Sequence, residues 1–204
     1  MNVQILEPNA TLTVLTVDPL SPPANLRRLV LTGFMGAGKT TVGRLLADRL
    51  GWEFVDLDTA IEARAGLTVP EIFATHGEAH FRKLEAQALA GELGRKKIVL
   101  ALGGGAPESL TNRLLLEQTP ATATIFLDAP FPTLFDRCRM QALDPGTTAR
   151  PNLADPVAAE ARFAARLPIY RRLAHHTIDT AGLTTEETVT TLLTRLHLPR
   201  PRRR

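Results

Sequence analysis

Residues 29–50 read LVLTGFMGAGKTTVGRLLADRL, and this stretch decides the fold. It begins with Leu29-Val30-Leu31, a short apolar run typical of a buried strand. Residues 33–40 then match G-x-x-x-x-G-K-[ST], in which the glycines allow backbone N–H groups to turn toward phosphate oxygens. Residues 40–50 carry apolar side chains at helical spacing and stop at Gly51. Strand, glycine loop and helix in this order predict a phosphate-binding loop.

The predicted loop has the residues needed to hold a nucleoside triphosphate. The N-terminus of the helix directs the positive end of its dipole toward the same anion. Lys39 is expected to reach the outer phosphates, and the hydroxyl of Thr40 to ligate Mg²⁺. The alternative is a glycine-rich turn that contains a lysine by accident, without a ligand.

Outside this stretch, strand and helix patterns alternate along the chain. Capping boxes at Thr68–Glu71 and Thr184–Glu187 mark the starts of two helices. Five buried strands that alternate with helices predict an α/β fold with a parallel sheet and helices on both faces. After the first strand, the others are predicted at 53–56, 98–102, 123–127 and 177–178. The remaining helices are predicted at 81–93, 132–142 and from the N-cap Asp155 to about 173.

Length and composition describe one ordinary globular domain. The chain has 204 residues, of which 44% are hydrophobic and 22% charged, and this excludes wholesale disorder. Its single cysteine, Cys138, excludes an internal disulfide framework and favours a reducing, cytoplasmic compartment. No run of about 18 apolar residues is present, so no transmembrane helix and no membrane partner are expected. We expect a monomer.

The net charge of +3 is concentrated at one end of the chain. Four arginines lie within the last five residues, and without them the chain carries one net negative charge. We therefore interpret 198–204 as a solvated basic tail and expect no nucleic-acid partner. Residues 1–26 are interpreted as a loosely ordered N-terminal extension, because prolines follow a short apolar run at 12–17. An extra edge strand or a partner-binding arm is the alternative.

Two carboxylates end the second strand, in Asp56-Leu57-Asp58. In an extended chain, residues i and i+2 point to the same side, so both carboxylates are expected at the carboxyl edge of the sheet. One acid can hold Mg²⁺ through water, and the other can accept a proton from an attacking hydroxyl. Alternatively, Asp58 caps a helix that starts at Thr59.

Three glycines, Gly103-Gly104-Gly105, follow the third strand directly. A run without side chains allows the backbone to touch a small ligand and to offer N–H groups to it. A simple turn is the alternative, but the place at another strand's carboxyl edge favours a ligand site.

Several blocks, taken in order, closely resemble the shikimate kinase family from about residue 27 to 197. They are GAGKTTVG at 36–43, DLD at 56–58, FATHGE at 73–78 with FRKLE at 81–85, GGG at 103–105, RP at 150–151 and RLPIY at 166–170. The resemblance implies phosphoryl transfer from ATP to the 3-hydroxyl of shikimate, which gives shikimate 3-phosphate on the route to chorismate and the aromatic amino acids. It also implies a three-layer α/β/α fold of the P-loop, nucleoside-monophosphate-kinase-like type, with strand order 2-3-1-4-5.

The resemblance also assigns roles to single residues. Arg82 and Arg166 would form a fork for the substrate carboxylate, with Glu85 orienting Arg82, and arginine suits this task because it donates two parallel hydrogen bonds. The shikimate pocket would contain Asp58, Arg82, Gly103, Gly104, Gly105 and Arg166. The ATP site would contain Gly36, Ala37, Gly38, Lys39, Thr40, Thr41, Arg139 and Arg150. Catalysis would rest on Lys39, Asp58 and Arg150, and Mg²⁺ on Thr40 and Asp56.

The turn-rich segment 144–155 corresponds to a lid in this family. Its closure would exclude water, and Arg150 would stabilise charge on the transferring phosphoryl group. His76 and His80 are four residues apart, but no third ligand has a suitable spacing, so no zinc site is expected. Two other functions stay open: a related kinase for another hydroxy acid such as gluconate, and an inactive kinase-like regulatory protein.

Overall fold

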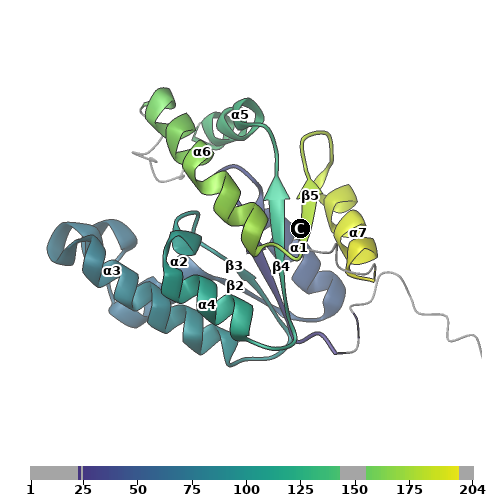
Figure 1. Ribbon diagram of the computed structural model, residues 1–204, viewed down its shortest axis with the longest axis horizontal. Helices are drawn as coiled ribbons and strands as arrows, with labels where there is room; N and C mark the ends of the chain where they lie inside the picture. The colour runs from purple at the N-terminus through teal and green to yellow at the C-terminus, as the bar shows by residue number, and fades with distance from the viewer. Residues whose placement is uncertain (1–22, 24, 143–154, 198–204) are drawn as a thin grey trace, which may run out of the picture.

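The protein forms a single parallel sheet with helices around it. The structure is a computed structural model that describes residues 23, 25–142 and 155–197. The strand order is β2-β3-β1-β4-β5, with every neighbouring pair parallel, as predicted. The strands are β1 (Arg28–Thr32), β2 (Glu53–Asp56), β3 (Ile98–Ala101), β4 (Thr122–Asp128) and β5 (His176–Asp179) (Figure 1).

Helices connect the strands. They are α1 (Lys39–Leu50), α2 (Leu57–Ala65), α3 (Val69–Leu93), α4 (Leu110–Gln118), α5 (Phe131–Ala142), α6 (Pro156–Leu173) and α7 (Thr185–Leu196), with a 3₁₀ turn η1 (Ala106–Glu108). Both predicted capping boxes form, at the starts of α3 and α7, and Asp155 caps α6 as predicted. The sequence reasoning missed α4, whose buried face carries the polar Asn112 beside Leu116, while Leu110 and Leu114 are exposed, so its leucines do not form one buried stripe.

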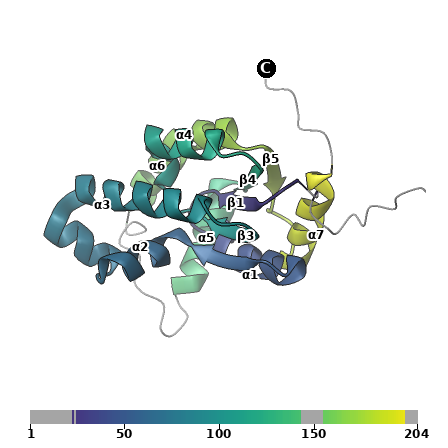
Figure 2. The same ribbon diagram turned by 90° about the horizontal axis from the view of Figure 1, so that it is seen from below.

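Two hydrophobic clusters cover the two faces of the sheet. Strand β1 is buried along its whole length, and its residues alternate between the clusters. Leu29 and Leu31 pack in the cluster that holds residues of α1 and α7, whereas Val30 packs in the cluster that holds residues of α3 and α4. Figure 2 shows the two helix layers from below. The three-layer arrangement follows from this alternation, because a buried parallel strand presents apolar side chains to both faces.

The segment after α2 contains the two helices that were expected there. A short helix from Thr68 and a separate helix over 81–93 were predicted, and α3 consists of two helical parts that meet at the non-helical residue Gly77, so the second part begins earlier than predicted. Gly77 has φ 76° and ψ 174°, a conformation that favours glycine and bends the helical path. The residues after this break carry Phe81, Arg82 and Glu85 toward the carboxyl edge of the sheet.

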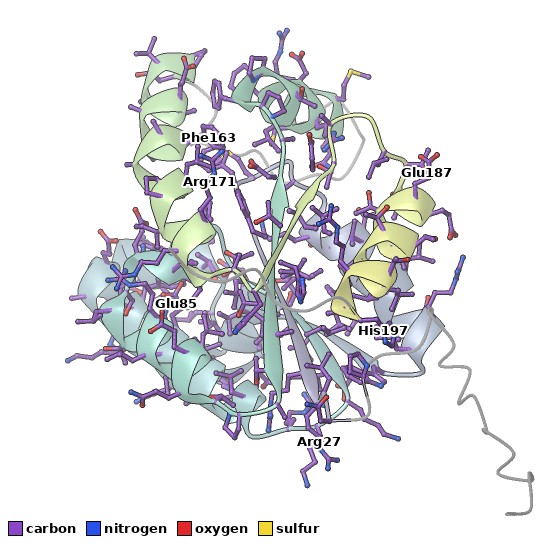
Figure 3. The ribbon with its side chains drawn as sticks, turned by 45° about the vertical axis from the view of Figure 1, so that its right-hand side comes forward. Arg27, Glu85, Phe163, Arg171, Glu187 and His197 are labelled. Atoms are coloured by element: carbon purple, nitrogen blue, oxygen red, sulfur yellow. The ribbon has the colours of Figure 1, made fainter. Side chains whose placement is uncertain are left out.

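Some predictions fall on other parts of the chain. The strand at 12–17, the tail at 198–204 and lid residues 144–154 lie outside the described residues. Within the described ranges, no helix is long and apolar enough to cross a bilayer. Figure 3 shows Arg27, just before β1, at the end of the sheet opposite to Phe163 of α6. The carboxyl edge therefore faces α6, and the candidate site lies at this edge.

Candidate active site

The loop between β1 and α1 has the backbone of a phosphate cradle. Gly36 and Gly38 have φ values of 77° and 84°, and Gly38 is the N-cap of α1. A Cβ atom on Gly36 would lie 2.2 Å from the carbonyl oxygen of Leu134 in α5. Glycine is therefore required at this position both by its φ angle and by the close approach of a neighbouring helix.

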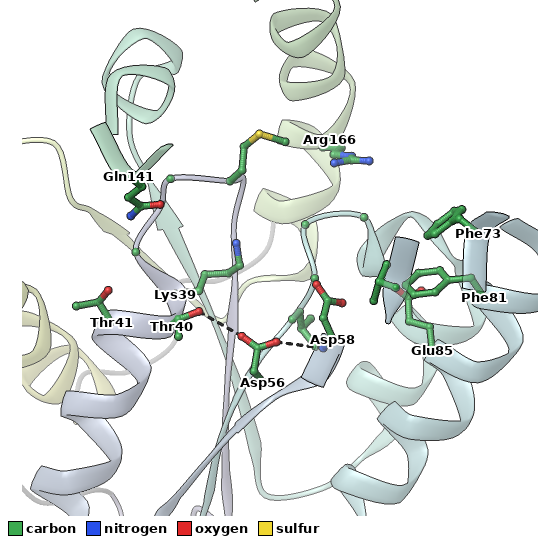
Figure 4. A pocket seen from close by; sticks show the side chains of 18 of the residues that line it. Lys39, Thr40, Thr41, Asp56, Asp58, Phe73, Phe81, Glu85, Gln141 and Arg166 are labelled. Carbon is green, nitrogen blue, oxygen red and sulfur yellow. Dashed lines mark hydrogen bonds between the residues drawn. The ribbon is translucent and has the colours of Figure 1, made fainter. Parts of the chain in front are cut away.

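Two side chains at the start of α1 point into the same space. Lys39 Nζ donates to the carbonyl oxygens of Gly33 (2.9 Å) and Phe34 (3.0 Å), so its charge lies over the loop. The Thr40 hydroxyl donates to Asp56 Oδ2 at 3.2 Å (Figure 4). The loop, Lys39 and the pair of Thr40 and Asp56 thus line the same space. We call residues 33–41 the phosphate-loop half of the site.

The acidic pair is placed by a different geometry from the one expected. Strand β2 ends at Asp56 and α2 begins at Leu57, so Asp58 lies in the first helical turn and the alternation of an extended chain does not apply. Asp56 caps α2, since its Oδ1 accepts from the Asp58 N–H at 3.1 Å. The alternative in which Asp58 caps a helix at Thr59 is therefore wrong. Both carboxylates nevertheless line the same cavity.

Asp58 is the electrostatically unusual carboxylate of the site. Burial raises its pKa to about 6, and the nearby negative charges of Asp56 and Glu85 act in the same direction, while Lys39 opposes them. A Cβ on Gly103 would lie 2.7 Å from Asp58 Oδ1, so the absence of a side chain there makes room for the carboxylate. A carboxylate with such a pKa is ionised at neutral pH and can still accept a proton.

Arg82 on α3 is held by carboxylates of its own helix. Its Nη1 lies 3.1 Å from Glu85 Oε1, and its Nη2 lies 3.1 Å from Glu78 Oε1. Glu85 is 1% exposed and also accepts a hydrogen bond from Asn112 Nδ2 of α4 at 2.9 Å. The contact between Arg82 and Glu85 is the one that the family resemblance implied, and the buried Asn112 that holds Glu85 was not foreseen.

Arg166 reaches the site from α6, far away in the sequence. Its Nη2 lies 2.8 Å from Glu108 Oε2, and Arg82 Nη2 lies 3.9 Å from the same oxygen. One turn later on α6, the buried Tyr170 hydroxyl donates to the Gly104 carbonyl oxygen at 2.6 Å. Helix α6 is thereby anchored to the glycine run. We call Arg82, Glu85, Gly103–Gly105 and Arg166 the acceptor half of the site.

A cavity of about 600 Å³ joins the two halves. Its lining includes most of the predicted residues, namely Gly36, Gly38, Lys39, Thr40, Thr41, Asp56, Asp58, Arg82, Gly103, Gly104, Gly105 and Arg166. Ala37 is buried and lies against a neighbouring hollow. Arg139 is exposed on α5 and does not line the cavity, whereas Gln141 of the same helix does. Arg150 lies outside the described residues.

Sequence reasoning left the apolar wall of the cavity unassigned. Phe73 and Phe81 line it, and their ring centroids are 4.6 Å apart. The spacing of eight residues between Phe73 and Phe81 could not by itself predict this contact. The bend at Gly77 decides how the two parts of α3 face each other, and it is seen only in the structure. Glu108, three residues beyond Gly105, was also missed.

The fold and the site define a class of protein. A phosphate loop lies at the carboxyl edge of a 2-3-1-4-5 parallel sheet and faces a second group of charged side chains across one cavity. This arrangement is characteristic of P-loop kinases with the nucleoside-monophosphate-kinase-like fold. A family model described as shikimate kinase matches residues 35–197. The chain belongs to the shikimate kinase family.

Individual relatives agree with this assignment over most of the chain. The shikimate kinase of Symbiobacterium thermophilum is 44% identical over 171 residues, which cover 82% of this chain and 95% of the relative. The shikimate kinase of Geobacter sulfurreducens is 42% identical over 178 residues, which cover 86% of this chain and 93% of the relative. Among solved structures, shikimate kinase from Acinetobacter baumannii in complex with shikimate matches with a TM-score of 0.73 at 36% identity, over 84% of this chain and 93% of that chain.

Proposed function

We propose that this protein transfers the γ-phosphoryl group of ATP to the 3-hydroxyl of shikimate and releases shikimate 3-phosphate and ADP, a step toward chorismate and the aromatic amino acids. One observation carries the proposal. The phosphate-loop half and the acceptor half line one cavity, and Asp58 lies between Lys39 on one side and Phe81 and Glu85 on the other (Figure 4). Family membership and a relative solved with shikimate support the choice of acceptor.

The acceptor half suits an anionic polyhydroxy ring. The guanidinium groups of Arg82 and Arg166 would bind the carboxylate, since each can donate two parallel hydrogen bonds. The glycine run would let the backbone approach the ring closely, and the Phe73 and Phe81 rings would cover its apolar parts. Asp58 would accept the proton of the attacking hydroxyl, a role that its raised pKa of about 6 suits.

The phosphate-loop half suits the triphosphate and a divalent cation. Thr40 and Asp56 offer a hydroxyl and a carboxylate oxygen 3.2 Å apart, and hard oxygen ligands of this kind fit Mg²⁺, which takes few protein ligands beside phosphates and water. Bound there, Mg²⁺ would neutralise charge on the phosphates. Lys39 would bind the outer phosphate oxygens in place of its present carbonyl partners, and the N–H groups of residues 36–41 would surround them.

Further parts of the proposal come from the family resemblance. Arg150 would stabilise the transferring phosphoryl group, Arg139 would contact the nucleotide, and residues 144–155 would close over it. We also propose a cytoplasmic monomer. The presence of a single cysteine, Cys138, which is buried, agrees with such a compartment.

A coupled ADP-release assay with shikimate, quinate and gluconate as acceptors tests the proposed function. We expect turnover with shikimate that depends on Mg²⁺, and far lower turnover with the other two acids. Activity with gluconate alone would contradict the proposal and show that the protein is the related kinase for another hydroxy acid. The absence of ADP release with all three would favour the inactive regulatory protein.

A further inference from the structure

Glu108 contacts an arginine of the acceptor half but has no part in the reaction as proposed. Its Oε2 atom lies 2.8 Å from Arg166 Nη2 and 3.9 Å from Arg82 Nη2. A Cβ placed on Gly105 would meet all three groups, at 3.0 Å from the Glu108 oxygen, 3.1 Å from the Arg82 nitrogen and 3.3 Å from the Arg166 nitrogen. One carboxylate and two guanidinium groups therefore converge on the space above Gly105.

We propose that Glu108 is an internal competitor of the acceptor, whose carboxylate occupies the arginine fork until the carboxylate of the acceptor displaces it. The inference rests on the proposed function, because it assumes that the acceptor carboxylate binds Arg82 and Arg166. An acceptor without a carboxylate cannot make this exchange and leaves Glu108 on the fork. Glu108 would thereby lower the affinity for acidic acceptors and leave the affinity for uncharged ones unchanged.

The mobility that the exchange needs is confined to the side chain. The backbone of Glu108 is fixed, since its N–H donates to the Gly105 carbonyl at 2.9 Å and its own carbonyl accepts from Arg113 Nη1 at 2.8 Å. Its side chain is 40% exposed, whereas that of Arg166 is 16% exposed. The glutamate can therefore rotate into solvent while the arginine stays in place.

The two arginines differ in what they lose when Glu108 leaves. Arg82 keeps its contacts with Glu85 and Glu78, which are shorter than its 3.9 Å contact with Glu108. Among the described residues, Glu108 is the one carboxylate within ion-pair distance of Arg166. The pair between Arg166 and Glu108 is thus the one exchanged. Glu85, being buried, has the different task of orienting Arg82.

The test compares Glu108→Gln with the wild-type chain. We expect the KM for shikimate, and its dissociation constant by calorimetry, to fall about two- to tenfold, because a glutamine competes for Arg166 without a charge. The kcat and the KM for ATP should stay unchanged. Glu160→Gln is the matched control, since it removes an exposed carboxylate from α6 that pairs with neither Arg82 nor Arg166, and it should leave the KM for shikimate near the wild-type value.

A second ligand distinguishes the displacement of Glu108 from a general effect of removing one negative charge near the site. The methyl ester of shikimate has no carboxylate, so it should bind the wild type and Glu108→Gln equally. Glu108→Ala should shift shikimate binding in the same direction as Glu108→Gln, and thermal unfolding confirms that each variant is folded.

The outcomes distinguish the two levels of the proposal. A wild-type chain that does not phosphorylate shikimate overturns the proposed function. An active wild type whose Glu108→Gln variant binds shikimate no more tightly, or an equal gain in Glu160→Gln, overturns the role of Glu108 alone.

Discussion

The two halves of the cavity are built in opposite ways. The phosphate-loop half comes from consecutive residues 33–41, and its shape depends on backbone angles such as φ 77° at Gly36. The acceptor half is assembled from side chains of α3 and α6 and from the glycine run after β3, which lie far apart in the sequence. The comparison teaches that a site for phosphates can be encoded locally, whereas a site for a particular acceptor depends on how distant elements pack.

The largest effect is expected where the two halves meet, at Asp58. Asp58→Asn keeps the shape of the side chain but removes the proton acceptor, so kcat should fall by about 10²- to 10⁴-fold. Nucleotide binding, followed by calorimetry, should survive because the phosphate loop is unchanged. Asp48→Asn on α1 is the control for loss of one carboxylate. Near-normal turnover in Asp58→Asn would remove Asp58 from the chemistry.

The phosphate-loop half should be broken by a change in backbone freedom alone. Gly36→Ala forces a left-handed φ on alanine and places a methyl group 2.2 Å from the Leu134 carbonyl, so we expect about a 100-fold loss of kcat/KM for ATP. Gly66→Ala is matched in φ, at 66°, but nothing lies within 4 Å of the new Cβ. It should cost about 1 kcal/mol of stability and leave activity intact. Equal losses of activity would show that strain alone, and not the close approach to α5, is responsible.

The acceptor half should instead depend on side-chain geometry. Arg166→Lys keeps the charge but loses the planar fork, so the KM for shikimate should rise about 10- to 50-fold. The KM for ATP should not change, and steady-state kinetics with each substrate varied in turn measures both. A rise in the KM for ATP of similar size would contradict the division of the cavity into two halves.

A smaller effect is expected at the anchor between α6 and the glycine run. Tyr170→Phe removes the 2.6 Å hydrogen bond to the Gly104 carbonyl, and the KM for shikimate should rise about three- to tenfold. Burial raises the pKa of the Tyr170 hydroxyl, so it remains a donor throughout the working range, and the effect should be independent of pH between 6 and about 9. An unchanged KM would mean that packing alone positions α6.

The smallest effect is expected away from both halves, at the capping box of α7. Backbone and side-chain hydrogen bonds from Thr184 lower the pKa of Glu187 below its ordinary value of 4.5. A carboxyl group whose pKa is lower in the folded state stabilises the fold above its unfolded pKa and loses this effect as the pH falls through the folded pKa.

Urea unfolding measures this effect directly. Wild type should be more stable than Glu187→Gln at pH 7, and the difference should shrink as the pH falls below about 4. Kinase activity at pH 7 should be equal in both. A difference in stability that persists unchanged at pH 3 would rule out the carboxylate as its source.

The elements that were predicted correctly depend on short stretches of chain. The phosphate loop, both capping boxes and the N-cap Asp155 involve residues within a few positions of one another, and the structure has all of them. Helix α4 was missed because its buried face includes the polar Asn112 and two of its leucines are exposed, so its sequence does not show one apolar stripe. Asp56 and Asp58 were expected to point to the same side as in a strand, but the capping bond of Asp56 starts α2 at Leu57, two residues before Thr59, and changes the geometry. A local hydrogen bond therefore outweighed the extended pattern.

The sequence by itself determined the strand–loop–helix unit at 29–50, the α/β class and the residue types of the site, because hydrophobic periodicity, glycine angles and caps act over a few residues. The tertiary structure alone decided that Glu108 meets Arg166, that Tyr170 bonds to Gly104 and that Asn112 holds Glu85. These contacts join elements that only the packing of α3, α4 and α6 against the sheet brings together. No local pattern in the chain encodes these contacts, because the distance between two such side chains depends on how all the elements between them pack.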